Sequence, residues 1–94
     1  MYDYLKLPEH MRGGTRRYIE QGIIPGDFLQ GVISNDLSRA AGAADDINRD
    51  LLYFWAGWFY NEAPSQSFGS PQKMAAWAEH RGLEGLKETH ENAG

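Results

Sequence analysis

Three arginines and two adjacent glycines lie close together near the start of the chain, in the segment LPEHMRGGTRRY. The arginines are Arg12, Arg16 and Arg17, and the planar fork of a guanidinium group binds phosphate oxygens through paired hydrogen bonds. Gly13 and Gly14 leave the adjacent backbone without side chains, so an anion can approach its N–H groups. The pattern is consistent with a site for a small phosphorylated ligand.

Two simpler interpretations of this segment remain open. Charged residues at helical spacing most often form a solvated face, and Arg16 with Glu20 makes an i, i+4 ion pair. Glycine inside a helix costs about 1 kcal/mol relative to alanine, so close packing of a second helix would equally explain Gly13 and Gly14. The sequence does not decide between helix packing and ligand binding.

A second group of residues with binding potential is the run YFWAGWFY at residues 53–60, which holds six aromatic side chains in eight positions. A helix turns fully in about 3.6 residues, so these rings point in all directions around the helix axis. One helical hairpin in a chain of 94 residues cannot cover them all. We expect the excess to contact another subunit, a planar ligand or both, because aromatic side chains are common at interfaces and also stack on bases.

The residue types used in metal binding and catalysis are present, but their arrangement favours neither. His10, His80 and His90 share no ligand spacing. Asp45 is better explained as a helix cap, and Glu62 in the motif NEAP has no nucleophile or oxyanion site near it in the sequence. We therefore predict a protein that is not an enzyme and that uses no metal or cofactor.

The composition limits the remaining classes of function. The 94 residues suffice for one small domain, and nine Lys and Arg against thirteen Asp and Glu give a net charge of −4. This charge argues against binding of DNA or RNA polymers, which usually requires a basic stripe, although a local cluster can still hold one anion. An acidic surface also fits an inhibitor that binds an enzyme in place of nucleic acid.

The sequence also bears on the compartment. Cysteine is absent, which suits a reducing cytosol. The N-terminal residues lack the apolar core of a signal peptide, and no apolar run approaches the roughly eighteen residues of a membrane span. We expect a soluble intracellular protein that does not associate with membranes.

The apolar residues recur with helical spacing throughout the chain, so we predict an all-α fold. A first helix is expected from Pro8 to a C-terminal cap at Gly22. A second is expected to start at Pro25 and to continue to a break at residues 42–45, with Gly31 in its middle indicating close packing. Its predicted buried face consists of Phe28, Leu29, Val32, Ile33, Leu37 and Ala40.

A third helix is expected between the N-cap Asp45 and Pro64, and a short fourth helix after the N-cap Ser70. The predicted buried face of the third consists of Ile47, Leu51, Leu52, Trp55, Trp58 and Phe59. Because the connection between them is short, the second and third helices should form an antiparallel hairpin. The predicted organisation is an N-terminal segment (residues 1–6), a helical domain (7–81) and a flexible, polar C-terminal tail (82–94).

Several motifs along the chain resemble a known family. Between Leu7 and Trp77 the motifs RYIEQGI, PG, FL, NDL, NEAP and GS, taken together, resemble the small phage proteins of the anti-CBASS protein 2 family. The helical hairpin also resembles one in a phage inhibitor of Thoeris defence. The resemblance implies a helical protein that assembles as a compact homo-oligomer, a hexamer, in the cytoplasm of the host bacterium.

The resemblance also implies a function as a nucleotide sponge. Such proteins bind cyclic oligonucleotides that bacterial cyclases make on infection, for example the cyclic dinucleotide cGAMP, and do not cleave them. Cyclic dinucleotides lie in pockets between protomers, and separate sites take cyclic trinucleotides. The expected result is a block of CBASS anti-phage immunity; the alternative is an acidic phage inhibitor that binds a host defence protein directly.

A cyclic dinucleotide carries two phosphates and two bases, so its pocket needs guanidinium groups and aromatic faces together. The candidate phosphate ligands are Arg12, Arg16 and Arg17, the backbone of Gly13 and Gly14, and the hydroxyl of Thr15. The candidate stacking residues are Tyr2, Tyr4, Tyr18 and Phe28. A polar loop with Ser65, Ser67, Phe68 and Ser70 is a candidate flap over the ligand, or else a simple connector in which Ser70 caps the next helix.

Overall fold

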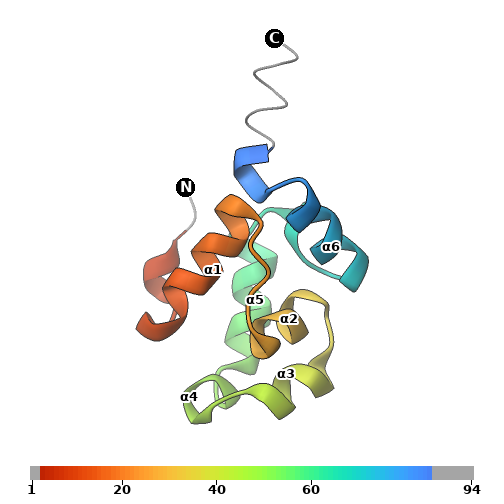
Figure 1. Cartoon of the computed structure of the whole chain (residues 1–94). Helices are drawn as coiled ribbons and strands as arrows, with labels where there is room; N and C mark the ends of the chain where they lie inside the picture. Colours follow the sequence, from red (N-terminus) through yellow and green to blue (C-terminus); the bar gives the residue numbers. More distant parts are fainter. Residues whose placement is uncertain (1–2, 86–94) are drawn as a thin grey trace.

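The structure, a computed structural model, describes residues 3–85. These residues are all-helical and compact and contain no strand, which confirms the predicted all-α class (Figure 1). The elements are η1 (Tyr4–Lys6), α1 (Glu9–Gln21), α2 (Asp27–Ile33), α3 (Leu37–Ala43), α4 (Asp46–Arg49), α5 (Leu52–Glu62), η2 (Ser65–Ser67) and α6 (Pro71–Glu79). No helix in the described part is long and apolar enough to cross a membrane.

The helix ends follow the local chemistry of the sequence. Gly22 ends α1 with φ 72°, a left-handed conformation that glycine adopts without strain. The carboxylate of Asp45 accepts a hydrogen bond from the backbone N–H of Asn48, and the Ser70 hydroxyl accepts one from that of Lys73. These are the caps that the sequence predicts, because a side-chain oxygen satisfies an N–H group that has no partner in the first turn.

The prediction of one continuous helix from Pro25 to about residue 41 is wrong. The chain turns at residues 34–36, where Asn35 has φ 61° and the Asp36 carboxylate caps α3 by accepting from the backbone N–H of Arg39. Asparagine and aspartate tolerate such turns because their side chains hydrogen-bond to the nearby backbone. As a consequence Leu37, which was expected in the core, is 70% exposed.

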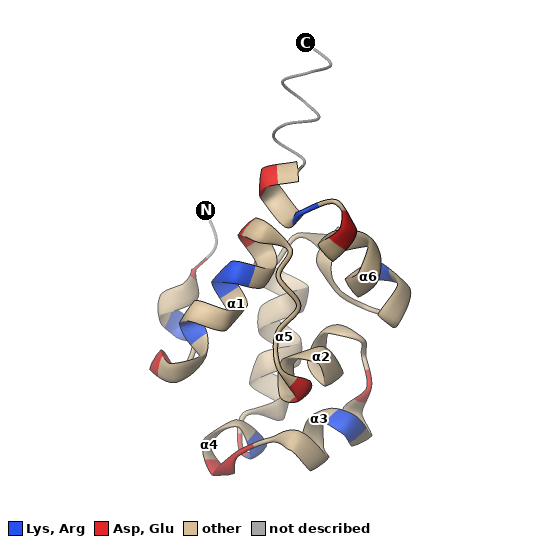
Figure 2. Ribbon diagram, viewed as in Figure 1, with Lys and Arg blue, Asp and Glu red and all other residues tan. Residues whose placement is uncertain are grey.

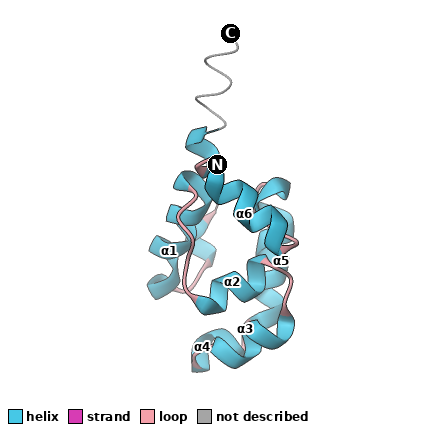
Figure 3. Cartoon of the chain, turned by 45° about the vertical axis from the view of Figure 1, so that its right-hand side comes forward, coloured by secondary structure: helices cyan, strands magenta, loops and turns pink. Residues whose placement is uncertain are grey.

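The turn folds α3 back against α2, and the two helices approach each other closely. A Cβ on Gly31 would lie 2.5 Å from the backbone nitrogen of Ala40, closer than any real Cβ contact. The predicted close packing at Gly31 is therefore confirmed, but its partner is α3. Figures 1 and 3 both place α3 and α4 beneath α2, at the end of the molecule away from α6.

The predicted third helix is also interrupted, at residues 50–51, so that α4 and α5 are separate elements. Ile47 on α4 is 56% exposed instead of buried, while Trp55, Trp58 and Phe59 on α5 form the centre of the core. The antiparallel hairpin expected between the second and third predicted helices is thus replaced by the shorter α2–α3 pair.

Each buried tryptophan has a partner for its indole N–H. Trp55 donates to the Asn48 side-chain oxygen, Trp58 to the Asp3 carbonyl and Trp77 to the Tyr18 carbonyl, each at 3.0 Å. Since a buried N–H without a partner is costly, these bonds fix how α5 and α6 pack on the rest of the chain.

The two ends of the helical domain are packed more closely than the predicted organisation implies. Tyr4, in the N-terminal segment, places its ring 5.9 Å from that of Trp58. Residues 82–85, assigned to the flexible tail, form a helical turn in which Leu83 packs against the core. A Cβ on Gly82 would lie 2.6 Å from the Ile19 carbonyl oxygen, so this turn meets α1 backbone to backbone. The rest of the predicted tail lies outside the described residues.

Candidate functional site

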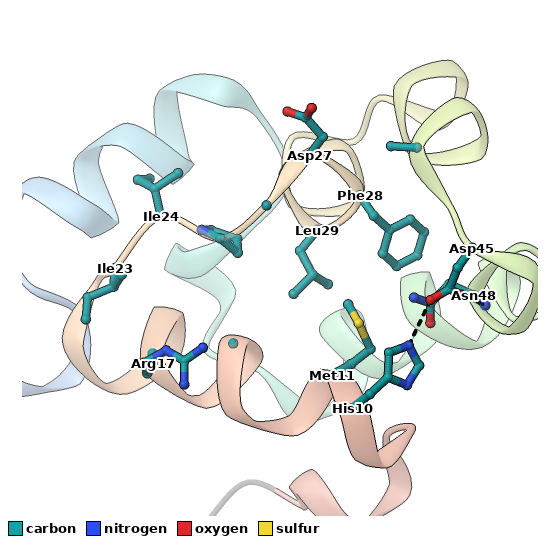
Figure 4. Close-up of a pocket in the computed structure, with 14 residues that line it drawn as sticks. His10, Met11, Arg17, Ile23, Ile24, Asp27, Phe28, Leu29, Asp45 and Asn48 are labelled. Carbon is teal, nitrogen blue, oxygen red and sulfur yellow. Dashed lines mark hydrogen bonds and ion pairs between the residues drawn. The ribbon is translucent and has the colours of Figure 1, made fainter.

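A groove of about 470 Å³ lies between α1, the segment at residues 23–26 and the start of α2 (Figure 4). This volume is within the range of about 300–1,000 Å³ that small-molecule pockets span. We call it the α1–α2 groove. Its lining consists of His10, Met11, Gly14, Arg17, Ile23, Ile24, Pro25, Gly26, Asp27, Phe28, Leu29, Ala43, Asp45 and Asn48.

The groove exists because the chain leaves α1 at Gly22 and crosses to α2 as an extended segment. The Gln30 side chain holds this segment by donating to the Pro25 carbonyl at 2.8 Å. Met11 from α1 and Phe28 and Leu29 from α2 face each other across the groove and form an apolar floor (Figure 4).

One end of the groove carries a free cation, Arg17. Its guanidinium group lies over the backbone of the glycine pair: Nη1 is 3.0 Å from a Cβ built on Gly13, and Nη2 is 3.8 Å from one built on Gly14. Arg17 is exposed and forms no ion pair or side-chain hydrogen bond with residues 3–85, whereas the other arginines there each have a partner. The nearest atoms to a Cβ on either glycine belong to the flexible Arg17 side chain, closely at Gly13 and at ordinary contact distance at Gly14, so within residues 3–85 no second helix packs on the glycine pair.

The opposite end of the groove carries a carboxylate. The two oxygens of Asp45 accept hydrogen bonds from the Asn48 backbone N–H at 2.7 Å and from His10 Nε2 at 2.9 Å. The bond from Asn48 and then the bond from His10 hold the pKa of the Asp45 carboxyl below its usual value. This pair joins α1 to α4, and Asn48 links it onward to Trp55 in the core.

The groove thus has an apolar middle, a cation at one end and a carboxylate at the other. An anionic group fits beside Arg17, a flat ring fits over the apolar floor, and hydrogen-bond donors fit beside the Asp45 carboxylate. Asp27 also lines the groove, but its carboxylate is paired with Arg39 at 3.1 Å. Figure 2 shows the basic residues of α1 apart from the acidic ones at the caps of α3 and α4.

The structure brings together only some of the site residues that the sequence predicts. Gly14, Arg17 and Phe28 line the groove, and Gly13 supports the Arg17 guanidinium. The other two arginines lie elsewhere: Arg12 donates to the carbonyls of Leu5 and Leu7, and Arg16 forms an ion pair with Glu20 at 3.2 Å.

Two further candidates are buried and correct the prediction of a ligand contact. Thr15 has no exposed surface, and its hydroxyl donates to the Met11 carbonyl at 2.8 Å. Tyr18 is also fully buried, its hydroxyl donates to the Ser67 carbonyl, and burial raises the pKa of Tyr18 well above its usual value. In this chain neither the Thr15 hydroxyl nor the Tyr18 ring presents a surface to a ligand.

The remaining candidates belong to the packing around α5 and α6. Tyr4 lies against Trp58, and Phe68 lies 5.8 Å from Phe59. Ser70 caps α6, as the connector interpretation holds, and Ser65 is exposed in η2. None of these four residues lines the α1–α2 groove, and Tyr2 lies outside the described residues.

The sequence interpretation missed the partners that complete the groove, above all His10, Met11 and Asn48. Asp45 was interpreted as a cap, which is confirmed, but its carboxylate also faces the groove. His10 and Asp45 are 35 positions apart, and only the course of the chain through α2 and α3 brings them together. No group of three or more His, Asp or Glu in residues 3–85 is placed to hold a metal ion.

Comparison of the chain with protein-family models, with curated proteins and with solved structures found no match.

Proposed function

We propose that this protein binds cyclic oligonucleotide second messengers, cyclic dinucleotides above all, and sequesters them without cleaving them, so that CBASS immunity of the host bacterium is not triggered. One observation carries the proposal: a free guanidinium, that of Arg17, lies over a glycine backbone at one end of a groove with an apolar floor. This combination suits a ligand that has phosphates and planar bases. The motif resemblance between Leu7 and Trp77 supports the same ligand class.

The groove also supports assembly into a homo-oligomer. A cyclic dinucleotide has two halves, each with one phosphate and one base, whereas the groove offers one free guanidinium and one apolar floor. Two copies related by a twofold axis would present a matching pair of grooves to the two halves. We propose such an intersubunit site within the hexamer that the resemblance implies; cyclic trinucleotides are proposed as additional ligands.

Sequestration requires tight binding and no chemical step. A nanomolar dissociation constant corresponds to about −12 kcal/mol. Two guanidinium–phosphate contacts and two buried bases can supply a free energy of this order, provided that the pocket is already formed before the ligand binds. The hydrogen bond from the Gln30 side chain to the Pro25 carbonyl fixes the extended segment that forms one wall of the groove.

The experiment is a comparison of Arg17→Ala with Arg16→Ala by calorimetry against a panel of cyclic di- and trinucleotides. Arg17→Ala is expected to weaken binding by about tenfold to a hundredfold, since a hydrogen bond to a charged group contributes about 1.5–3 kcal/mol. Arg16→Ala removes the same charge from the same helix, but its partner is Glu20 outside the groove, so binding should stay near wild type. Equal losses in both variants, or no binding of any cyclic oligonucleotide to the wild type, would contradict the proposal.

The absence of cleavage has its own readout. Wild-type protein is incubated with the cyclic dinucleotide that binds best, and the protein is then denatured by heat. Chromatography should recover the ligand intact and in full. A linear product would show hydrolysis and would exclude a sponge.

A second candidate function, direct binding of a host defence protein, is favoured by a different observation. Tyr53 and Tyr60 lie on one face of α5 and are 96% and 79% exposed. Exposed aromatic side chains are typical of protein interfaces. A stable complex with a host protein that survives Arg17→Ala, together with no change in melting temperature on addition of cyclic nucleotides, would favour this candidate over the sponge.

A further inference from the structure

The acidic end of the α1–α2 groove differs from what phosphate binding alone requires. A carboxylate repels phosphates, yet Asp45 lines the same groove as Arg17 and lies at its opposite end (Figure 4). The Asp45 side chain is about half exposed, so its oxygens remain accessible from the groove. Because the Asp45 carboxylate disfavours the phosphates of a nucleotide ligand, it should contact a different part of that ligand.

The Asp45 carboxylate is held in a fixed orientation and retains acceptor capacity. One carboxylate oxygen accepts a hydrogen bond from the Asn48 backbone N–H, and the other oxygen accepts one from His10 Nε2. A carboxylate has about four acceptor positions, so two remain for a ligand. Because both existing partners come from the protein, the remaining positions are oriented before a ligand arrives.

Base chemistry decides which ligand fits two adjacent acceptors. The Watson–Crick edge of guanine presents two neighbouring donors, N1–H and the N2 amino group, which match the two oxygens of one carboxylate. Adenine presents one amino donor beside the N1 lone pair, and that lone pair is repelled by a carboxylate. Cytosine has the same mixed edge as adenine, and the single N–H of uracil lies between two carbonyl oxygens.

We propose that the α1–α2 groove selects guanine over adenine, with the base on the floor formed by Met11, Phe28 and Leu29, its N1–H and N2 amino groups on the Asp45 carboxylate, and its phosphate toward Arg17. His10 is a positioning residue that orients Asp45. This inference rests on the proposed function, since it names the base of the same ligand. It predicts guanine-containing cyclic dinucleotides as the preferred ligands.

The test measures binding of cyclic di-GMP, cyclic GMP–AMP and cyclic di-AMP to the wild-type protein by calorimetry. Cyclic di-GMP is expected to bind about tenfold or more tightly than cyclic di-AMP, a discrimination of the size that one bidentate pair provides. Cyclic GMP–AMP, with one guanine, is expected to lie between them. Equal affinities, or tighter binding of cyclic di-AMP, would overturn the guanine selection and leave the sponge function intact. Failure of all three to bind would overturn both proposals.

The variant Asp45→Asn assigns the selection to the carboxylate. Asparagine caps a helix as well as aspartate does, so α4 is retained, but the amide group replaces one acceptor oxygen by a donor. The preference for cyclic di-GMP should fall to about threefold or less, an order-of-magnitude expectation for loss of one bidentate pair. Asp36→Asn is the matched control, because Asp36 caps α3 in the same way but does not line the groove. An undiminished preference in Asp45→Asn, or the same fall in Asp36→Asn, would contradict the assignment.

Discussion

At the scale of single residues, the types needed for binding were visible in the sequence, but their availability was not. Arg12, Arg16 and Arg17 look equivalent in the printed sequence, yet two of them already have protein partners. The carbonyls that hold Arg12 belong to Leu5 in η1 and to Leu7, which caps η1, so their position depends on where η1 packs. Only the folded chain shows that, among residues 3–85, the Arg17 guanidinium is the one without an ion pair or side-chain hydrogen bond.

The pair of His10 and Asp45 leads to a prediction about acid stability. Hydrogen bonds from the Asn48 backbone and from His10 lower the pKa of Asp45 in the folded chain. A lowered folded-state pKa means that the ionised carboxylate stabilises the fold above its unfolded pKa of about 3.9, and that this contribution is lost as the pH falls through the folded value. Urea unfolding from pH 7 to pH 2 should therefore show a steeper loss of stability below about pH 4 in the wild type than in Asp45→Asn.

Asp36→Asn controls for the same exchange at another N-cap. Parallel stability profiles for the wild type and Asp45→Asn over this pH range would show that the carboxylate does not contribute as the geometry indicates.

At the scale of elements, the residues that cap the helices were predictable from the sequence, but the positions at which the predicted helices are interrupted were not. Gly22, Asp45 and Ser70 end or begin helices as local chemistry dictates, because each acts through neighbouring backbone groups. The break at residues 34–36 carried a signal in Ser34, Asn35 and Asp36, which favour turns. The apolar periodicity on either side continued in phase and hid that signal, so one long helix was predicted where α2 and α3 fold back.

The α2–α3 contact gives a stability prediction with a built-in control. Gly31→Ala places a Cβ 2.5 Å from the Ala40 nitrogen and 2.8 Å from its Cα, and backbone atoms cannot move aside as a flexible side chain can. We expect a loss of about 1–3 kcal/mol or more, as overpacking typically costs. In a domain of this size each 1 kcal/mol lowers the melting temperature by about 4–8 °C, which circular dichroism detects.

Gly42→Ala is the matched control on α3, because apart from its chain neighbours and the backbone of its own helix nothing lies within 4 Å of its Cβ position. Alanine should there stabilise the helix by about 0.5–1 kcal/mol. A melting temperature for Gly31→Ala at or above that of Gly42→Ala would disprove the tight α2–α3 contact.

At the scale of the whole molecule, the aromatic run at residues 53–60 was only partly accounted for within one chain. Trp55, Trp58 and Phe59 are buried and Phe54 is half-buried, so the single chain covers some of the six rings but not all, as expected. The side chains of Tyr53 and Tyr60 remain exposed to solvent. Which rings would be covered depended on the α2–α3 turn and on α6, and neither the turn nor the packing of α6 follows from helical periodicity.

The exposed face of α5 predicts how copies of the chain associate. Tyr53 and Tyr60 are seven positions apart on one helix and therefore on the same side, and α5 carries a single charged residue, Glu62, at its end. A twofold contact brings each side chain near its own copy, so an uncharged face avoids repulsion between like charges in a chain of net charge −4.

Light scattering of the wild type should give a multiple of 10.6 kDa, and Tyr60→Lys should shift the measured mass toward 10.6 kDa by placing like charges together. Since Tyr60 is 79% exposed in the single chain, the variant should keep its helical circular dichroism spectrum. Gln72→Lys, which adds the same charge at an exposed position of α6, should leave the mass unchanged. A Tyr60→Lys variant with the wild-type mass would exclude this face as the interface. A wild type of 10.6 kDa would exclude it as well and would also remove the second copy that the proposed site requires.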